Sequence, residues 1–450
     1  MRRFPKLALV AAFVVGATLL PLPAWSLSAP QTLAERAGLG TLRGEGPVLD
    51  PAFPIDFVGL SWASGEEPEV RFLAPDGWTP WRTAHLDGLQ AVHGRVGSGL
   101  VSAGGADAYQ VRGAAEEVRA LAVNTTDGPR SLEWSVPPTA SATHLSQPAV
   151  VSRQAWGADE SFRFNSKGEL RSRPSFFPTQ KLIVHHTVTS NTDADPAATV
   201  RAIYYDHVKN RGFADIAYNF LIDAQGNIYK GRYSGKPGTS DADTPTGENA
   251  RGKGVTGAHT GGYNSGTMGV ALLGTFTSVA PTPQARDALI EHLAWEADHH
   301  GLDPLATSVY TNPDSGASKK NPNITGHRDW GSTACPGGSL YADMPAIRQE
   351  VAARAGRVDA RPPRIRSVFG DARRRSAVIR WETNEPADSL VRYRVKGGGW
   401  RTTNLKPRAV ESHRMRIKGL KRDRRYAYRV LSKDRSGNLS RSRRSTFTTG

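Results

Sequence analysis

Two proline-rich stretches constrain the fold of this 450-residue chain more than any other feature. One covers 136–148 and the other 360–363. Proline fixes φ and removes a backbone donor, so stretches of this kind favour extended linkers over packed structure. We therefore expect a multidomain protein with three folded units, at 31–145, 146–356 and 362–450, and not a single core.

The first 26 residues have the pattern of an export signal. Two arginines and a lysine precede an apolar run at 7–22, and Ala24-Trp25-Ser26 offers small residues for cleavage. The run is shorter than the ~20 residues that span a bilayer comfortably, although a membrane anchor stays open as a second interpretation. We expect a signal peptide at 1–26, with the general secretory and twin-arginine routes both open, and no membrane span after cleavage.

Cysteine usage limits what can stabilise an exported chain of this kind. Cys335 is the only cysteine, so no intrachain disulfide can form. Stability outside the cell must then come from packing or from a metal. A thiol in an exported protein is also liable to oxidation unless it is buried or coordinated.

The first unit, 31–145, is predicted to be β-rich. Apolar and polar residues alternate in four segments separated by turn residues, at 56–62, 69–74, 105–113 and 117–126. A small β-sandwich fits this pattern. The unit contains no catalytic constellation, and its His85 and His93 are isolated in the sequence.

The middle unit, 146–356, alternates strands with helices. We expect strands at 181–187, 216–223, 226–232 and 267–276, and helices at 196–210, 283–300 and about 340–355. Thr282 followed by Pro283 marks the start of the second helix, and Gly301 marks its end. This order predicts an α/β unit with a mixed sheet and flanking helices.

Histidine and cysteine side chains in this unit could hold a metal. His327 and Cys335 lie eight residues apart in "GHRDWGSTACPGG", and "LIVHHTVT" at 182–189 offers a further histidine at a strand end. Imidazole and thiolate are the ligands that zinc prefers, and three protein ligands leave a fourth position open for catalysis. The residue types alone leave a second interpretation open, in which these are a core histidine and a small buried thiol.

Six segments of the middle unit together resemble the type 2 N-acetylmuramoyl-L-alanine amidases, the family that includes the peptidoglycan recognition proteins. They are "VSRQAWGAD" (151–159), "LIVHHTVT" (182–189), "GFADIAYNFLIDAQGNIYKGR" (212–232), "GAHTGGYNSGTMGVALLGTF" (257–276), "TPQARDALIEHLAW" (282–295) and "GHRDWGSTACPG" (326–337). They follow the family's order. The resemblance implies the amidase fold and one Zn²⁺ held by His185, His327 and Cys335. His186 does not match the ligand position, and adjacent side chains on a strand face opposite sides.

The resemblance also implies roles for four further residues. Tyr218 matches the family's catalytic tyrosine, whose phenol can donate to the oxyanion formed when water attacks an amide. Thr333 matches a position near the reacting carbonyl, where relatives carry Lys or Thr. His259 fits a cleft position that contacts substrate or assists proton transfer, and Asn264 is expected to line the same cleft.

The activity that the resemblance implies is hydrolysis of the amide between N-acetylmuramic acid and L-alanine in bacterial peptidoglycan, by a secreted protein acting at the cell wall. The alternative is a receptor of the same fold that binds peptidoglycan without cutting it. Relatives that only bind commonly lack the cysteine ligand, and Cys335 is present here, so we favour the enzyme.

Two other parts of the unit are expected to stand outside the site. Asp298, His299 and His300 look like a metal cluster but end an amphipathic helix, where a solvated last turn near the negative helix end is expected. The segment at 233–255 is long and rich in Gly, Thr and Asp, unlike the shorter connection in the animal proteins, so no specificity residues are carried across.

The C-terminal unit, 362–450, is predicted to be a β-sandwich. It resembles a fibronectin type III module, and the residues that carry the resemblance are Trp381, the "TNEPADS" loop, Tyr393, Leu420, Tyr428, Asp434, Gly437 and Asn438. The resemblance implies seven strands. It says little about a ligand.

Positive charge is concentrated at the C-terminal end. Residues 357–450 hold 27 Lys+Arg and 8 Asp+Glu, a net +19, whereas the rest of the chain carries a net −3. We expect this unit to meet anionic cell-wall polymers. Nucleic acid is not expected as a partner, because the export signal argues against it and the basic runs lack interleaved aromatic residues for stacking bases.

Overall fold

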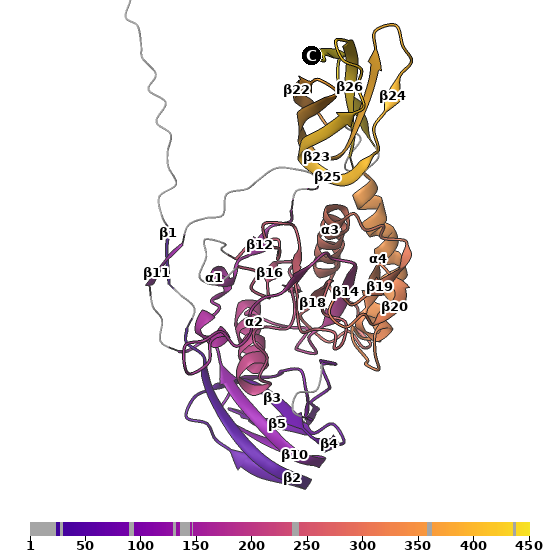
Figure 1. Ribbon diagram of the computed structural model, residues 1–450. Coiled ribbons are helices and arrows are strands. Elements are labelled where there is room, and N and C mark those ends of the chain that lie inside the picture. The colour runs from indigo at the N-terminus through magenta and orange to yellow at the C-terminus, as the bar shows by residue number, and fades with distance from the viewer. Residues whose placement is uncertain are drawn as a thin grey trace, which may run out of the picture.

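A computed structural model describes residues 24–27, 30–89, 94–128, 132–135, 145, 147–235, 243–357, 362–434 and 438–450. Most of the predicted signal peptide, most of the first proline-rich stretch, His93 and Gly437 lie outside the described residues. Figure 1 shows a β unit, a central α/β unit and a second β unit in chain order. Among the described helices, none combines the length and the apolar character needed to cross a membrane.

The first unit is an antiparallel nine-stranded sheet built around one long strand, β10 (Ala108–Asn124). One edge of β10 pairs with β2 (Leu33–Leu49), and its other edge pairs in turn with β5, β4 and β3. The remaining bounds are β3 Ile55–Trp62, β4 Ser64–Gly65, β5 Glu69–Ala74, β6 Gly77–Trp78, β7 Arg82–Thr83, β8 Val96–Gly97 and β9 Val101–Ala106. A separate pair joins β1 (Ala24–Leu27) to β11 (Leu132–Ser135). The predicted β-rich character is confirmed.

The central sheet has the strand order β12-β16-β15-β18-β14-β21. The bounds are β12 Val150–Val151, β14 Lys181–His186, β15 Phe220–Ile222, β16 Ile228–Lys230, β18 Thr267–Leu272 and β21 Ile324–Gly326. Only the hairpin of β15 and β16 is antiparallel; the other pairs are parallel, so the sheet is mixed, as predicted. Two further strand pairs join β13 (Phe176–Phe177) to β17 (Gly254–Val255) and β19 (Thr307–Thr311) to β20 (Ser318–Pro322).

Helices cover both faces of this sheet, which is why its strands are apolar almost throughout. The helices are α1 Arg153–Trp156, η1 Glu160–Arg163, α2 Pro196–Tyr205 with a π turn η2 Asp206–Asn210, α3 Pro283–His300, η3 His327–Asp329 and α4 Gly338–Arg357. The Thr282 hydroxyl accepts from the Ala285 N–H at 3.1 Å, and Gly301 ends α3 with φ 64°, as the sequence predicts.

Successive side chains of a strand point to opposite faces of the sheet, so the position of a residue along its strand decides which helix its side chain contacts. In β15, Phe220 and Ile222 pack in one cluster with α3 and α4, whereas Leu221 between them packs with α2. The same parity applies in β14, where Val184 belongs to the α3 side. His185 must then face the α2 side and His186 the α3 side.

The first unit and the central unit share one hydrophobic core. Phe57, Leu100 and Leu121 of the first unit are buried in the same cluster as Val200 and Tyr204 of α2. Figure 1 shows α2 lying against the first unit's sheet. The first unit therefore buries a face of the central unit that would otherwise meet water.

A buried ion network reinforces this junction. Arg211 Nη2 lies 2.7 Å from Asp87 Oδ2 of the first unit, and Arg211 Nε lies 2.8 Å from Asp206 Oδ2 at the end of α2. All three side chains are at most 7% exposed. Because each charge has a partner, the network fixes the position of the Asp87 loop relative to α2.

The C-terminal unit has the expected seven strands, but they form one curled sheet and not two separate ones. The first part of β23 (Ser376–Val395) pairs with β22 and β25, and its last part pairs with β24 and β26. The other bounds are β22 Ile365–Arg373, β24 Arg401–Thr402, β25 Lys406–Lys418, β26 Arg425–Lys433, β27 Leu439–Arg441 and β28 Ser445–Thr448. Its core, which includes Trp381, Val391 and Tyr428, is its own.

The shared core predicts that damage to the first unit spreads to the central one. Leu121→Ala should destabilise both by ~2–5 kcal/mol, because it removes a fully buried side chain from the common cluster. Hydrogen exchange followed by mass spectrometry should show lost protection in 30–128 and in 147–357 together. Ile379→Ala, in the separate C-terminal core, should affect 362–450 alone. Protection lost only within 30–128 in Leu121→Ala would contradict a shared core.

Candidate active site

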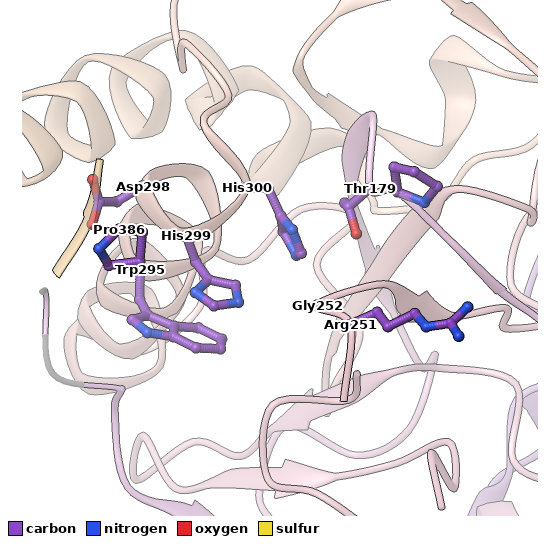
Figure 2. A pocket seen from close by; sticks show the side chains of 9 residues that line it. Thr179, Arg251, Gly252, Trp295, Asp298, His299, His300 and Pro386 are labelled. Atoms are coloured by element: carbon purple, nitrogen blue, oxygen red, sulfur yellow. The ribbon is translucent and has the colours of Figure 1, made fainter. Parts of the chain in front are cut away.

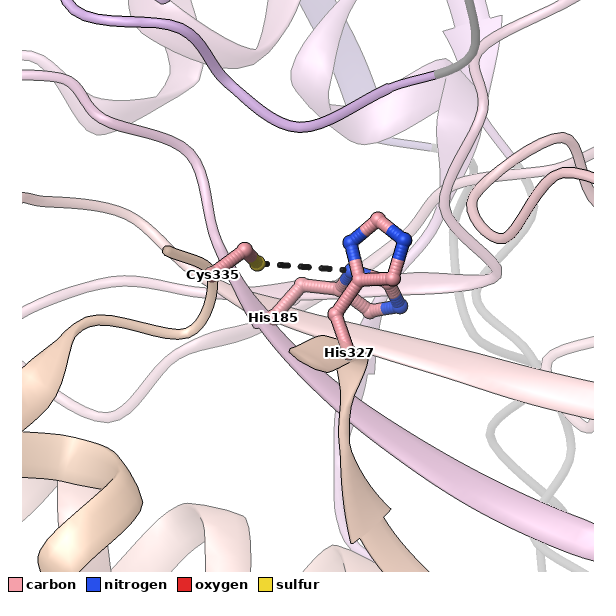
Figure 3. A group of neighbouring side chains, drawn as sticks. All are labelled: His185, His327 and Cys335. Carbon is pink, nitrogen blue, oxygen red and sulfur yellow. Dashed lines mark hydrogen bonds between the residues drawn. The ribbon is translucent and has the colours of Figure 1, made fainter. Parts of the chain in front are cut away.

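Parallel pairing brings the three predicted metal ligands together at one edge of the central sheet. His185 is the penultimate residue of β14, and His327 follows directly after β21, the strand that pairs in parallel with β14. Cys335 comes from the loop that leads into α4. One ligand atom from each lies within 4.8 Å of the others, and Cys335 Sγ lies 3.6 Å from His185 Nδ1 (Figure 3).

The loop between His327 and Cys335 is held by its own hydrogen bonds. The Gly326 N–H donates to Asp329 Oδ2 at 2.9 Å, and the Arg328 N–H donates to the Cys335 carbonyl at 3.0 Å. The Cys335 N–H donates to the Thr333 hydroxyl at 3.1 Å. These bonds curl the loop back on itself, so that both its ends reach the end of β14.

Burial sets the protonation of the ligands. It lowers the pKa of His185 well below its ordinary value, and the neighbouring His327 and His259 lower it further. Burial also lowers the pKa of His327 to about 4. Both rings are therefore neutral at pH 7, the form that coordinates a metal. Burial raises the pKa of the Cys335 thiol, an effect that a bound cation would reverse.

These residues fit a zinc ion. Two imidazoles and a thiol are a donor set typical of zinc sites. The buried Nδ1 of His327 has no hydrogen-bond partner, and a buried polar atom without one is costly. Coordination is one way to satisfy such an atom.

His186 lies on the other face of β14, as the strand parity requires. Its Nδ1 accepts from the Phe276 N–H at 3.2 Å, and its ring packs 6.4 Å from the Phe276 ring. Its side chain is absent from the group that could hold the metal. The adjacent histidine therefore has a structural hydrogen bond in place of a ligand role.

Tyr218 is brought to the cluster from the residue pair that precedes β15. Its ring lies 5.4 Å from the His185 ring, and the side chain is 1% exposed. Burial raises the pKa of the phenol well above its ordinary value, and Asp87 and Cys335 add to the shift. The hydroxyl is therefore protonated and able to donate.

His259 contacts a predicted ligand and is fully buried. Its Nδ1 lies 3.1 Å from His185 Nε2 and 2.9 Å from the Thr260 hydroxyl. Burial lowers its pKa to about 3. Asn264 is placed differently, because its side-chain oxygen accepts from the Thr260 N–H at 2.7 Å and so closes the turn after His259.

A loop of the first unit also borders the site, and the sequence analysis did not identify it. A Cβ built at Gly88 would lie 2.3 Å from Thr333 Oγ1 and 3.4 Å from Cys335 Cβ. Gly88 also has φ +79°, so a side chain there is excluded by conformation as well as by space. The only sequence signal was an Asp-Gly pair typical of a turn, which says nothing about what the turn contacts.

The expectation of a solvated last turn in α3 is wrong for His300. Its side chain is 5% exposed, and its Nδ1 lies 3.6 Å from Glu248 Oε1. Glu248 lies in the long segment, 233–255, for which no specificity residues were carried across from the animal proteins. Its separation of about fifty positions from His300 leaves no local pattern that could have revealed the pair.

Comparison with known proteins identifies the central and C-terminal units. Residues 175–338 match the family described as N-acetylmuramoyl-L-alanine amidase, and residues 362–449 match the family described as purple acid phosphatase, N-terminal domain. The C-terminal unit therefore matches a family other than fibronectin type III, and the expected fibronectin type III module is not confirmed. The coarser expectation of a β-rich C-terminal unit is confirmed.

Similar proteins match about two fifths of this chain. A peptidoglycan recognition protein of Trichoplusia ni is 30% identical over 169 residues, 37% of this chain and 74% of that protein. Peptidoglycan recognition protein 1 of Bos taurus is 30% identical over 196 residues, 43% of this chain and 80% of that protein. The N-acetylmuramoyl-L-alanine amidase of Homo sapiens is 29% identical over 203 residues, 44% of this chain and 28% of that protein.

Among solved structures, Drosophila PGRP-LB is 26% identical, covers 44% of this chain and 93% of its own, and has a TM-score of 0.31. The family assignment rests on the sequence relatives and on the amidase match at 175–338. The chain belongs to the family of peptidoglycan recognition proteins and N-acetylmuramoyl-L-alanine amidases.

Proposed function

We propose that this protein is a secreted, zinc-dependent N-acetylmuramoyl-L-alanine amidase that hydrolyses the amide between N-acetylmuramic acid and L-alanine in bacterial peptidoglycan. The observation that carries the proposal is the approach of Cys335 to His185 and His327. A receptor that only binds peptidoglycan needs no buried thiol beside two buried imidazoles. The complete ligand set therefore favours the enzyme over a non-catalytic receptor of the same fold.

The zinc ion would be held by His185, His327 and Cys335, with the fourth coordination position open to water or substrate. A zinc ion held by these residues would supply a bound water of lowered pKa and a Lewis acid for the scissile carbonyl. His259 contacts the other nitrogen of the His185 ring, because its Nδ1 lies 3.1 Å from the Nε2 of His185, whereas Cys335 lies beside His185 Nδ1. A second-layer contact of this kind fixes the orientation of a ligand ring.

Tyr218 and Thr333 would act on the substrate itself. The protonated phenol of Tyr218 donates a hydrogen bond to the oxyanion, where charge develops during attack on the amide. The Thr333 hydroxyl already accepts the Cys335 N–H, which leaves its own hydrogen free to donate to the substrate. Thr333 is half-buried, whereas Tyr218 and Cys335 are each 1% exposed. Substrate therefore approaches from the Thr333 side, past the Gly88 loop.

The C-terminal unit would act as a tether to the wall. Residues 362–450 hold 25 Lys+Arg and 7 Asp+Glu, a net +18, on a sheet with its own core. Cationic residues attract anionic polymers, such as the phosphate-bearing chains of bacterial walls, in a salt-dependent way. We infer that this unit concentrates the enzyme on the wall and takes no part in cleavage.

Replacement of the Cys335 thiol should distinguish a zinc ligand from a neighbouring residue that does not bind zinc. In Cys335→Ser, the free Zn²⁺ concentration that restores half of the activity should rise at least about 100-fold, since even outer-layer partners contribute 10–100-fold to metal affinity. His186→Asn is the matched control, because an amide oxygen can replace Nδ1 as the acceptor for Phe276, and it should leave this concentration unchanged. Equal zinc requirements for the two variants would refute the ligand assignment.

Removing the phenol should affect turnover without affecting the metal. Tyr218→Phe keeps the buried ring but removes a donor to the oxyanion, which should lower kcat on the order of 100-fold. Zinc content and thermal stability, measured on the same preparation, should match the parent protein. A kcat within about twofold of the parent would show that Tyr218 only fills the core.

Removal of the C-terminal unit should affect wall binding alone. A chain ending at residue 361 should cleave small soluble muropeptides at the parental rate, because the C-terminal core is separate. It should also lose retention on purified walls at low salt. The full chain should lose the same retention at high salt, because the Debye length falls from about 10 Å at 0.1 M to about 3 Å at 1 M. Sedimentation of both proteins with walls tests this, and equal retention at low salt would exclude the tether.

A further inference from the structure

A second cluster of potential metal ligands lies at the C-terminal end of α3, away from the amidase site. His292, Glu296 and His300 follow each other at four-residue spacing, so their side chains lie along one face of the helix. His292 and Glu296 are fully buried, and the His300 side chain is 5% exposed. Lysine or arginine would be ordinary at a helix end, whereas a buried carboxylate between two histidines is not.

Glu248 joins this cluster from the segment before β17. Its Oε2 lies 2.7 Å from His299 Nε2, and its Oε1 lies 3.6 Å from His300 Nδ1. On the other side of the same ring, His300 Nε2 lies 3.1 Å from Glu296 Oε2. Glu248, His299 and His300 each offer a ligand atom within 4.8 Å of the other two.

A second acidic side chain, Glu296, lies on the other side of the His300 ring in a dry environment. Neither oxygen of Glu296 makes a hydrogen bond, although imidazole nitrogens of His292 and His300 lie 3.5 Å and 3.1 Å away. Burial raises the pKa of Glu296 well above its ordinary value, and the Glu248 carboxylate raises it further. A buried charge is tolerated when it is paired or bound to a metal. Because its pKa is raised, Glu296 is protonated, and Glu248 is the carboxylate of the cluster.

We propose that Glu248, His299 and His300 form a second site for a divalent transition-metal ion. Two imidazoles and one carboxylate suit Zn²⁺ and related first-row cations. Ligand atoms about 2.0–2.2 Å from a tetrahedral zinc lie roughly 3.3–3.6 Å apart. The distances of 2.7 Å from Glu248 Oε2 to His299 Nε2 and 3.6 Å from Glu248 Oε1 to His300 Nδ1 bracket that range, so small side-chain rotations complete the geometry.

The cluster can be reached from solvent. Figure 2 shows His299 and His300 beside a pocket of about 280 Å³, with Trp295 on one side and Thr179 and Arg251 across from them. A metal site needs a route of entry as well as ligands. This pocket supplies one, and none of His185, His327 and Cys335 lines it.

The role of this site would be structural. Two of its ligands lie on α3, and the third lies on the segment before β17. The bound ion would fasten the segment that carries Glu248 to α3. That segment continues into β17, where the Val255 carbonyl accepts from Asn219 Nδ2 at 2.8 Å, beside the proposed catalytic Tyr218. Fixing the segment would therefore steady one wall of the amidase site.

Metal stoichiometry of the full chain tests the proposal. After tag removal, loading with excess Zn²⁺ and desalting, mass spectrometry of the metal should find about two zinc ions per chain, one per site. Glu248→Gln/His300→Gln should hold about one. Asp298→Asn, on the same last turn but outside the ligand group, should still hold about two.

The amidase-site variant distinguishes the two sites. Cys335→Ser keeps every ligand of the second site, so it should retain one zinc ion even though the amidase site is lost. In Co²⁺-loaded protein, Glu248→Gln/His300→Gln should keep the thiolate-to-cobalt absorption of the Cys335 site at full intensity. This retained band also shows that the double variant is folded.

Two results would overturn the second site. One is a Cys335→Ser protein that retains no zinc, and the other is a double variant that binds as much zinc as the parent. Either result would mean that the three side chains share protons and not a metal. The outcome is independent of the amidase proposal, which fails only if the Cys335 band or the activity is absent.

Discussion

The parallel pairing of β14 with β21 is the constraint on which the candidate site depends. It places the ends of two adjacent strands at one sheet edge, so that His185 and His327 meet although 142 positions separate them in the chain. The pairing holds because both strands are covered on both faces and all their residues are buried. A shift of one residue in β14 would exchange His185 for His186 and turn the ligand away from the metal.

Burial has opposite consequences for the side chains at this edge. It keeps the imidazoles neutral and the phenol protonated, which are the forms needed for coordination and for donation. It opposes the thiolate form of Cys335, which a cation would favour. The first unit contributes to this burial through the Asp87 loop, so the chemical environment of the site is made by two units of the chain.

Local patterns in the sequence predicted the parts of the fold that depend on local physics. The caps at Thr282 and Gly301, the hairpin around Asp223 and the opposite orientation of His185 and His186 all follow from helix and strand geometry. The resemblance to a family supplied the distant partners of His185. The sequence patterns did not predict contacts between residues that lie far apart in the chain. Glu248 beside His300 and Gly88 beside Thr333 depend on how loops fold over a finished sheet.

The shared core around α2 also bears on how such a chain could exchange parts in evolution. Val200, Ile203 and Tyr204 are covered by the first unit's sheet and are almost entirely hidden from water. A central unit transferred alone into another gene would present these side chains as an apolar patch, which invites aggregation. The central unit of this chain therefore depends on its β-rich neighbour to cover an apolar surface, whereas the C-terminal unit has a core of its own and could be gained or lost without exposing one.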